Sequence, residues 1–395
     1  MAARGRRARR KDAVVNDERI LDAAVEVIAA VGVDQLTTSN VASAAGLTTG
    51  AIYGRYLNRE ELLAEVWLQR CGPRLHQSVV DLRAAMGLSD KSDEARQRVL
   101  AAMASPDGLL RAAVELCVVT PRTDELSDVV PADVARWFDL AGAGRDGDVV
   151  GADAMVELGL FAEVVGWVLL SPVAGARSPD WSALLAHTAA PSPVPTWLVP
   201  QRNGGVIELV DEVTDPERRA LINGGNRVVA RSGVSRATLS RIARAGGLPP
   251  TAVYAHYDDR LEFILDLIHQ VDSWLMRDDE RARLFSSPRV AAFALTQWLA
   301  DPAAQRRRVM VEFTLAAAHQ HEIADAYADA HLGSSERAAK IAGEMTGQPD
   351  NAEEVVAVGL CLILGSAVLA DLGDLVVGRD WRQVADIAMA PYAPA

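Results

Sequence analysis

Hydrophobic residues recur along most of this chain at the three- and four-residue spacing that is typical of amphipathic helices. Between residues 20 and 31, the apolar positions that fall on one helical face are Ile20, Ala23, Ala24, Val27, Ile28 and Val31. The alternating pattern of a β-strand is suggested only around residues 206–210. The pattern therefore predicts an almost entirely α-helical fold.

The helical pattern occurs twice. When the sequence is shifted by 201 residues, positions 18–66 align with positions 219–267 without a gap, and 15 of the 49 positions are identical. The identities include Gly32/Gly233, Thr37/Thr238, Ala42/Ala243, Gly46/Gly247, Leu47/Leu248, Tyr53/Tyr254, Tyr56/Tyr257 and Arg59/Arg260. Weaker matches follow at offsets of 197 and 200 residues, such as Glu115 with Glu312 and Trp181 with Trp381. A period this long indicates a duplicated domain rather than a solenoid.

Residues 38–57 have the spacing of a helix-turn-helix motif. Gly46 falls at the sharp turn, which glycine tolerates best. Thr37 or Thr38 can cap the first helix and Thr48 the second. The small core between the helices is predicted to contain Val41, Ala42, Ala45, Leu47 and Ile52, matched in the second copy by Ile242, Ala243, Leu248 and Val253.

Prolines and glycines concentrate between the copies, over residues 189–216, which is typical of a semi-stiff linker. Asp215 followed by Pro216 predicts the start of the next helix. We therefore divide the chain into a basic arm (1–12), a first helix-turn-helix domain (13–62), a first helical ligand-binding-type domain (63–190), a linker (191–215), a second helix-turn-helix domain (216–263) and a second helical domain (264–395).

The net charge of −13 argues at first against a nucleic-acid partner, but the charges are segregated along the chain. The first eleven residues carry six cations, which are Arg4, Arg6, Arg7, Arg9, Arg10 and Lys11. Residues 218–257 carry seven arginines and no carboxylate. Two basic zones on an acidic body are compatible with DNA binding.

The three cysteines, Cys71, Cys117 and Cys361, lie far apart in no paired motif, which favours a reducing cytoplasm over a disulfide framework or a zinc site. The basic N-terminus has no apolar run behind it, so no signal peptide is predicted. The longest apolar run, residues 355–370, is sixteen residues long and short for a membrane span. We expect a buried bundle helix there, and a cytoplasmic protein with no membrane partner.

The segments 46–63 and 247–264, with the preceding helices that end at Gly32 and Gly233, resemble the DNA-binding domain of the TetR family. The resemblance is strong over about 50 residues in each copy, and the remaining helices are compatible with the family's variable ligand-binding domain. The resemblance implies a tandem form of the family in which one chain carries two TetR-like units.

The resemblance also implies which residues contact DNA. Tyr53 and Arg59 match residues that bind phosphates, whereas Thr49, Gly50, Ala51 and Arg55 match the base-reading face and Tyr56 matches a core aromatic. The full set of predicted DNA contacts in the first half is Arg6, Arg7, Arg9, Arg10, Thr38, Thr48, Thr49, Gly50, Ala51, Tyr53, Arg55 and Arg59. In the second half it is Arg241, Pro250, Thr251, Tyr254, His256 and Arg260.

The second copy departs from the pattern of the family. Asp258 and Asp259 directly precede Arg260, where negative charge would repel phosphate. Arg236, Arg241 and Arg244 lie around its first helix and offer positive charge instead. A degenerate second helix-turn-helix is therefore an alternative hypothesis.

The remaining polar and aromatic residues point to no catalytic, metal or cofactor site. No hydrolase, P-loop, zinc-protease or dinucleotide-binding motif is present, so an enzyme is not predicted. His319 and His321 are two residues apart and point to different helical faces, which disfavours a metal site. Aromatic residues at helical spacing are more often plain core than pocket lining. Those that could line a ligand pocket are Trp137, Phe138, Trp167, Trp298 and Phe313.

These observations predict a sequence-specific transcriptional regulator. Its partners would be a double-stranded DNA operator and a small-molecule effector that releases it, and its two units would pair within one chain as a pseudodimer, with further self-association possible. The alternatives are a regulator with a degenerate second head and a small-molecule-binding protein that does not bind DNA.

Overall fold

The computed structural model describes residues 2–86, 93–138, 152–174, 213–275, 303–346 and 352–373, with a few single positions between 295 and 384. Within these ranges every regular element is a helix and none is a strand, which confirms the predicted all-α fold. The strand-like pattern at residues 206–210 and most of the expected linker lie outside the described residues.

The described elements of the first half run from the N-terminus to residue 174. They are α1 (Ala2–Val31), η1 (Val33–Gln35), α2 (Thr38–Ala45), α3 (Thr49–Tyr53), α4 (Arg59–Val66), η2 (Trp67–Cys71), α5 (Gly72–Ala85), α6 (Asp93–Ala104), α7 (Gly108–Val119), η3 (Thr120–Arg122), α8 (Asp124–Trp137) and α9 (Ala152–Ala174). Those of the second half are α11 (Pro216–Ser232), α12 (Leu239–Ala245), η6 (Ala252–Ala255), α13 (Arg260–Leu275), α16 (Ala304–Ala317), α17 (His321–Tyr327), η8 (Ala328–Leu332), α18 (Gly333–Thr346) and α19 (Ala352–Asp371).

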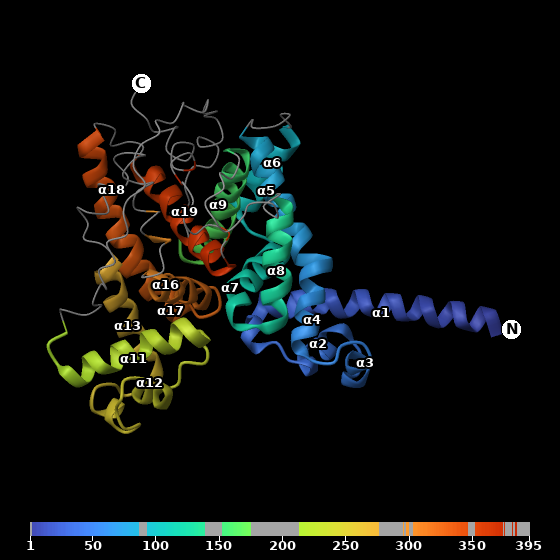
Figure 1. Ribbon diagram of the computed structural model, residues 1–395, viewed down its shortest axis with the longest axis horizontal. Helices are drawn as coiled ribbons and strands as arrows, with labels where there is room; N and C mark the ends of the chain where they lie inside the picture. The colour runs from blue at the N-terminus through green and yellow to red at the C-terminus, as the bar shows by residue number, and fades with distance from the viewer. Residues whose placement is uncertain are drawn as a thin grey trace.

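Helix α1 is longer than the sequence pattern suggests. It begins at Ala2 and takes in the residues that were assigned to a separate basic arm. Alanine, arginine and lysine are good helix formers and no proline interrupts them, so the helix continues beyond the part that packs on the body. In Figure 1 this extension projects out from the body, and the N-terminus lies at the end away from α11 and α12.

The start of α11 follows the prediction. The Asp215 side chain accepts hydrogen bonds from the backbone N–H groups of Glu217 (2.8 Å) and Arg218 (3.1 Å). Pro216 occupies the first turn, where no N–H donor is required. This cap fixes the point at which the second half of the chain becomes helical.

The helices that follow α4 in the first half pack around Trp67, which is fully buried directly after α4. Its indole N–H donates to Asp133 Oδ2 on α8 at 3.0 Å. The helix widens into the π-turn η2 at this point, where the Gly72 N–H bonds the carbonyl of Trp67 and Pro73 has no N–H to donate. The turn brings the backbone of Gly72 against the indole ring.

The two halves meet where α9 crosses α19, and glycines allow the close approach. A Cβ atom on Gly166 would lie 1.8 Å from the carbonyl oxygen of Cys361, and one on Gly365 would lie 1.8 Å from that of Ala162. Gly166 and Gly365 are 199 residues apart, and so are Ala162 and Cys361. The same contact is therefore made twice with the roles of the two helices exchanged.

Burial of the apolar helices agrees with the sequence pattern. Cys361 and Leu364 in α19 are fully buried, which confirms the buried helix predicted over residues 355–370. Among the described residues, Ala154–Val173 in α9 is long and apolar enough to cross a membrane, and 72% of its apolar window is buried inside the structure. It packs against α5, α7, α16 and α19.

Figure 1 shows how the halves are arranged. Helices α2 and α3 of the first half and α12 of the second lie along the lower edge, below the bodies, while α9 and α19 lie above them in the centre. We call residues 16–66 the first head and residues 215–267 the second head, and we call the described residues that follow each head within its half the first body (67–174) and the second body (from 268 onward). Both heads therefore face the same side of the molecule.

Candidate nucleic-acid interface

Local capping builds the helix-turn-helix of the first head. Thr37 is the cap of α2: its side chain accepts from the Asn40 N–H at 3.2 Å, and its own N–H donates to Asn40 Oδ1 at 2.8 Å. Gly46 ends α2 in the left-handed conformation (φ 63°), which glycine adopts without strain. Thr48 then caps α3 by accepting from the Ala51 N–H at 3.3 Å. The predicted caps and turn are confirmed.

Helix α3 presents a polar face to solvent. Thr48, Thr49 and Gly50 are exposed, while Ile52 on the opposite face is fully buried. Tyr53 is 58% exposed, and its hydroxyl lies 3.1 Å from Thr38 Oγ1 on α2. The structure thus brings together Thr38, Thr48, Thr49, Gly50, Ala51 and Tyr53 from the predicted set of DNA contacts. The predicted core residues Val41, Ala42, Ala45 and Ile52 are buried, as is Tyr56.

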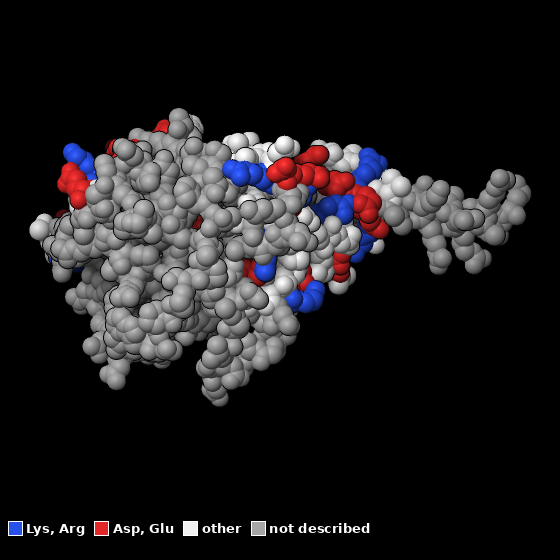
Figure 2. Space-filling view, turned by 90° about the horizontal axis from the view of Figure 1, so that it is seen from above, with Lys and Arg blue, Asp and Glu red and all other residues white. Residues whose placement is uncertain are grey.

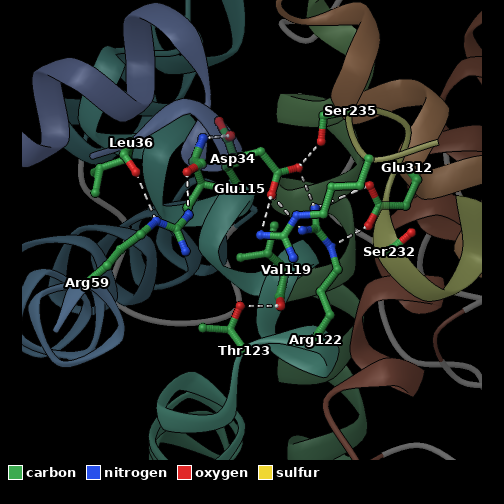
Figure 3. A network of polar contacts seen from close by, with 12 residues as sticks. Asp34, Leu36, Arg59, Glu115, Val119, Arg122, Thr123, Ser232, Ser235 and Glu312 are labelled. Carbon is green, nitrogen blue, oxygen red and sulfur yellow. Dashed lines mark hydrogen bonds and ion pairs between the residues drawn. The ribbon is translucent and has the colours of Figure 1, made fainter. Parts of the chain in front are cut away.

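Arg55 and Arg59 have partners within the protein that the sequence did not reveal. Arg55 donates to the Ala51 carbonyl at 2.9 Å and forms an ion pair with Asp17 on α1. Arg59 donates from Nε to the Leu36 carbonyl at 3.0 Å and from Nη2 to the Val33 carbonyl at 2.5 Å (Figure 3). Arg59 therefore holds the loop between α1 and α2 against α4, and its contact with phosphate stays a prediction.

The second head repeats much of this arrangement. Thr238 caps α12 by accepting from the Arg241 N–H at 3.4 Å. Arg260 donates to the Ala237 carbonyl at 2.9 Å and to the Val234 carbonyl at 2.5 Å, which are the counterparts of the Leu36 and Val33 carbonyls. Burial lowers the pKa of the Arg260 guanidinium, in agreement with its enclosed position. In both heads, therefore, the equivalent arginine binds two carbonyl groups of the loop that precedes the helix-turn-helix.

The counterpart of α3 in the second head is a 3₁₀ turn rather than an α-helix. Pro249 and Pro250 stand where Thr48 and Thr49 stand in the first head, and they supply neither a capping side chain nor backbone N–H donors. The turn closes through bonds of the tighter type, from the Tyr254 N–H to the Thr251 carbonyl at 3.2 Å. Recognition by this segment would require a shape different from that of α3.

Some of the predicted DNA contacts of the second head are open to solvent, and others bind neighbouring residues of the same head. Thr251 and Tyr254 are exposed, with Tyr254 62% exposed, and Pro250 lies beside them on the surface. His256 is 15% exposed, and its Nε2 lies 3.4 Å from a carboxylate oxygen of Glu217. Arg241 donates to the Arg236 carbonyl at 2.8 Å. His256 and Arg241 are thus engaged with neighbouring elements of the same head.

Asp259 has a structural role that sequence reasoning missed. Its Oδ1 accepts from the Glu262 N–H at 2.9 Å, in the same way that Asn58 accepts from the Glu61 N–H at 2.7 Å in the first head. Both side chains therefore cap the following helix. The signal was available, because aspartate and asparagine are the strongest helix caps.

The candidate pocket aromatics lie in the packed core or, for Trp137 and Trp298, partly buried against it. Trp137 is stacked on Trp67 and His76, with ring centroids 5.9 and 5.0 Å away. Phe138 packs edge-on against Phe161 at 6.0 Å. Trp167 is 1% exposed and donates to the Met103 carbonyl at 2.8 Å. In the second half, Trp298 donates to the Ile363 carbonyl at 3.2 Å and Phe313 is fully buried. The role of these side chains in ligand binding stays a prediction.

Among the described residues, those on the face opposite the heads carry charges of both signs. In Figure 2, which looks down on that face, the described Lys and Arg side chains lie beside Asp and Glu side chains toward the end where α1 leaves the body. The side chains of Arg6, Arg7, Arg9 and Arg10 on the extension of α1 lie outside the described residues.

Comparisons with known proteins agree with the geometry of the first head. Residues 20–66 match the family described as "Bacterial regulatory proteins, tetR family". These residues form a TetR-family helix-turn-helix domain. The TetR match ends at Val66, one residue before the buried Trp67.

One curated relative shares part of the chain. The "Fatty acid metabolism regulator protein" of Bacillus subtilis (strain 168) is 33% identical over 73 residues. The aligned segment covers 18% of this chain and 38% of that regulator. The similarity therefore concerns a regulator protein and spans well under half of its length.

Proposed function

We propose that this chain is a sequence-specific DNA-binding transcriptional regulator that works as a single-chain pseudodimer. The observation that carries the proposal is the TetR-family domain at residues 20–66, whose recognition helix α3 leaves Thr49, Gly50 and Tyr53 open to solvent. Exposed hydroxyl groups and a helix N-terminus at this point suit contacts with phosphates and base edges.

The arrangement of the second half supports a second TetR-like unit. Arg260 makes the same pair of carbonyl contacts as Arg59, and both heads lie on one side of the molecule (Figure 1). The exchanged glycine contacts of α9 and α19 are those of an isologous interface, in which residue i meets j and j meets i. The two heads would then read two unlike half-sites of one asymmetric operator.

The extension of α1 adds a positively charged element next to the first head. It holds six cations within eleven residues and points away from the second head in Figure 1. Charge of this kind supplies affinity for the phosphate backbone rather than base specificity. It would therefore contact DNA that flanks the first half-site.

Selection of binding sites from a random duplex library, followed by affinity measurements, tests the proposal. Tyr53→Phe removes one hydroxyl from an exposed ring and should weaken binding to all selected sequences. Arg55→Ala should instead relax the preference at one or two base pairs, by about 1–3 kcal/mol. Failure of the wild-type protein to enrich any sequence, or equal affinity of the Tyr53→Phe variant, would contradict DNA binding by the first head.

A second candidate function is a regulator in which only the first head binds DNA. The 3₁₀ turn at Ala252–Ala255 favours it, and so does Leu239, which stands at the position of Thr38 and has no hydroxyl group to offer Tyr254. Tyr254→Phe is the matched variant of Tyr53→Phe. Equal losses of affinity support two DNA-reading heads, whereas an effect of Tyr53→Phe alone supports one.

Control by a small molecule is the remaining part of the proposal, with repression as its expected sense. An effector bound in either helical body would act by favouring one separation of the heads. The name of the Bacillus subtilis relative makes fatty acids the first compounds to test. A compound that lowers the affinity for selected DNA without unfolding the protein supports the proposal; a wide panel without effect contradicts it.

A further inference from the structure

Six polar residues, four from helical elements and two from loops, meet between the two heads and the two bodies. Five of them are labelled in Figure 3. Asp34 lies in η1 of the first head and Ser235 in the matching loop of the second head, where the Ser235 hydroxyl donates to Asp34 Oδ2 at 2.5 Å. The other four residues lie on the bodies. We call Asp34, Glu115, Arg122, Ser235, Glu312 and His319 the crossover cluster.

Arg122 is the central cation of the crossover cluster. Its Nη1 and Nη2 donate to the two carboxylate oxygens of Asp34 at 2.7 and 3.1 Å, and its Nε donates to Glu312 Oε1 at 3.0 Å. Asp34 belongs to the head of the same half, whereas Glu312 belongs to the body of the other half. The Arg122 side chain is only 10% exposed. One guanidinium with fixed fork geometry therefore joins a head to the opposite body.

A second set of contacts mirrors the first. Glu115 accepts a hydrogen bond from the Val33 N–H of the first head, and its Oε2 lies 3.0 Å from Nε2 of His319 on the second half. Glu115 and Glu312 are 197 residues apart, and so are Arg122 and His319. Arg122 and His319 therefore stand at equivalent positions of the two halves, and each contacts the glutamate of the opposite body.

The glutamates also occupy equivalent places beside the heads. Glu115 lies next to Gly32 and Glu312 next to Gly233, the two positive-φ glycines at which α1 and α11 end. A Cβ atom on Gly233 would lie 2.8 Å from Glu312 Oε2 and 2.9 Å from Arg122 Nη2. The cluster is thus packed against the point where each head begins to turn toward α2 or α12.

Because the cluster is buried, its contacts cannot be loosened one at a time. The side chains of Glu115, Glu312 and Arg122 are 5%, 7% and 10% exposed, so loss of one partner leaves a charge that water cannot reach easily. Removing one member of a buried ion pair is strongly destabilising, because the other charge stays buried without a partner. The heads can therefore change their separation only if the contacts are broken together or exchanged for another complete set.

We propose that the crossover cluster sets the distance between the two heads and thereby the spacing of the half-sites that the chain accepts. Arg122, Glu312 and Asp34 are positioning residues, because they fix the two loops that carry α2 and α12. The half-site part of this inference rests on the proposed function, whereas the distance part does not.

A distance measurement on the DNA-free full chain tests the cluster directly. Ser43→Cys on α2 and Arg244→Cys on α12 are exposed positions 201 residues apart, and the native Cys71, Cys117 and Cys361 are buried and should not take a spin label. The parent protein should give one narrow distance peak by pulsed electron paramagnetic resonance. Arg122→Ala should lose that single peak and spread over several distances.

The matched control is Arg98→Ala, because Arg98 forms a comparable two-pronged pair with Asp81 within one half (2.9 and 2.7 Å). The control should keep the narrow peak. If Arg122→Ala does not fold, the combined variant Arg122→Met, Asp34→Asn and Glu312→Gln decides, since it removes the cross-links and leaves no unpaired charge among these three residues. A folded variant of either kind that keeps the parent peak overturns the proposal.

Operator spacing gives the second readout. Half-sites selected by the wild-type protein are placed at a series of separations, and affinity is measured for each without spin labels. The wild-type and Arg98→Ala proteins should prefer one separation, and the Arg122 variant should accept several with nearly equal affinity. An identical spacing profile in the variant overturns the inference while DNA binding stands. Absence of any DNA binding by wild type refutes the proposed function and the half-site part, but leaves the distance result to decide the role of the cluster.

Discussion

Gly166 and Gly365 offer a sharp test of the contact between the halves. Replacement of either by alanine places a methyl carbon 1.8 Å from a backbone carbonyl oxygen, whereas ordinary contact begins at 3.4 Å. Helices α9 and α19 would have to separate locally by about 1.6 Å, which forfeits dispersion contacts along the crossing. Since the nearest neighbours of both glycines are backbone atoms rather than flexible side chains, the backbone itself must move.

The expected cost follows from these distances. Overpacking of a well-packed core costs about 1–3 kcal/mol and sometimes more, and a required shift larger than 1 Å places these variants at about 3 kcal/mol or above. Gly333→Ala is the matched control, because among the residues that the structure describes its new methyl would meet only the flexible end of Arg337, at 3.7 Å. The control should gain up to about 1 kcal/mol from the better helix propensity of alanine.

Urea unfolding followed by circular dichroism measures these differences. The double variant adds a further signature, because the helix separation forced by one alanine also relieves the clash of the other. The cost of the double variant should therefore be smaller than the sum of the two single costs. Wild-type stability of either single variant, or strict additivity of the two, would refute the crossing as described.

Three further predictions concern the arm, one buried amide and one buried acid. Deletion of residues 1–11, which hold six cations, should weaken DNA binding strongly at low salt and little at high salt; gel shifts at two salt concentrations measure this, and an equal loss at both contradicts an ionic role. Asn226 is 1% exposed, neither polar atom of its side chain has a hydrogen-bond partner among the described residues, and Val25 stands at the matching position of the first half. Asn226→Val should therefore raise the free energy of unfolding by about 1–3 kcal/mol, and a lower urea midpoint would count against the assignment. Burial raises the pKa of Glu312 to about 7, although the charge of Arg122 opposes the shift. A carboxyl group whose folded-state pKa lies above its unfolded-state value binds more protons when folded, so its contribution to stability is lost as pH rises from 4.5 to about 7. Glu312→Gln should flatten the fall in stability over this window, and parallel pH profiles of the two proteins would exclude Glu312 as its source.

Much of the first head follows from local rules in the sequence. The apolar spacing, the caps at Thr37 and Thr48 and the turn at Gly46 depend on residues within a few positions of one another, and the structure contains all of them. The repeat also indicated which late helices correspond, and α9 and α19 are the pair that cross.

Other parts of the site depend on contacts that no local pattern contains. Arg59 matches a phosphate-binding position, yet the carbonyl groups that it binds belong to a loop more than twenty residues earlier in the chain. Arg122 meets Glu312, which is 190 residues later. The 3₁₀ turn of the second head follows Pro249 and Pro250, which provide neither a cap nor backbone N–H donors, so this departure from α3 could have been predicted from the sequence.

The contact between Asp34 and Ser235 has a consequence for how such a chain can diverge. In a dimer of two identical chains, a residue next to the twofold axis meets its own copy, so an aspartate there would face an aspartate. Here Asp34 meets the serine that stands 201 residues later, so the carboxylate that Arg122 binds does not face a second carboxylate. When two such units are joined in one chain, the residues next to the axis can differ, so neither has to be compatible with a copy of itself. A first half expressed alone would bring two Asp34 carboxylates together if it paired with itself in the same way, and their repulsion would disfavour that pairing.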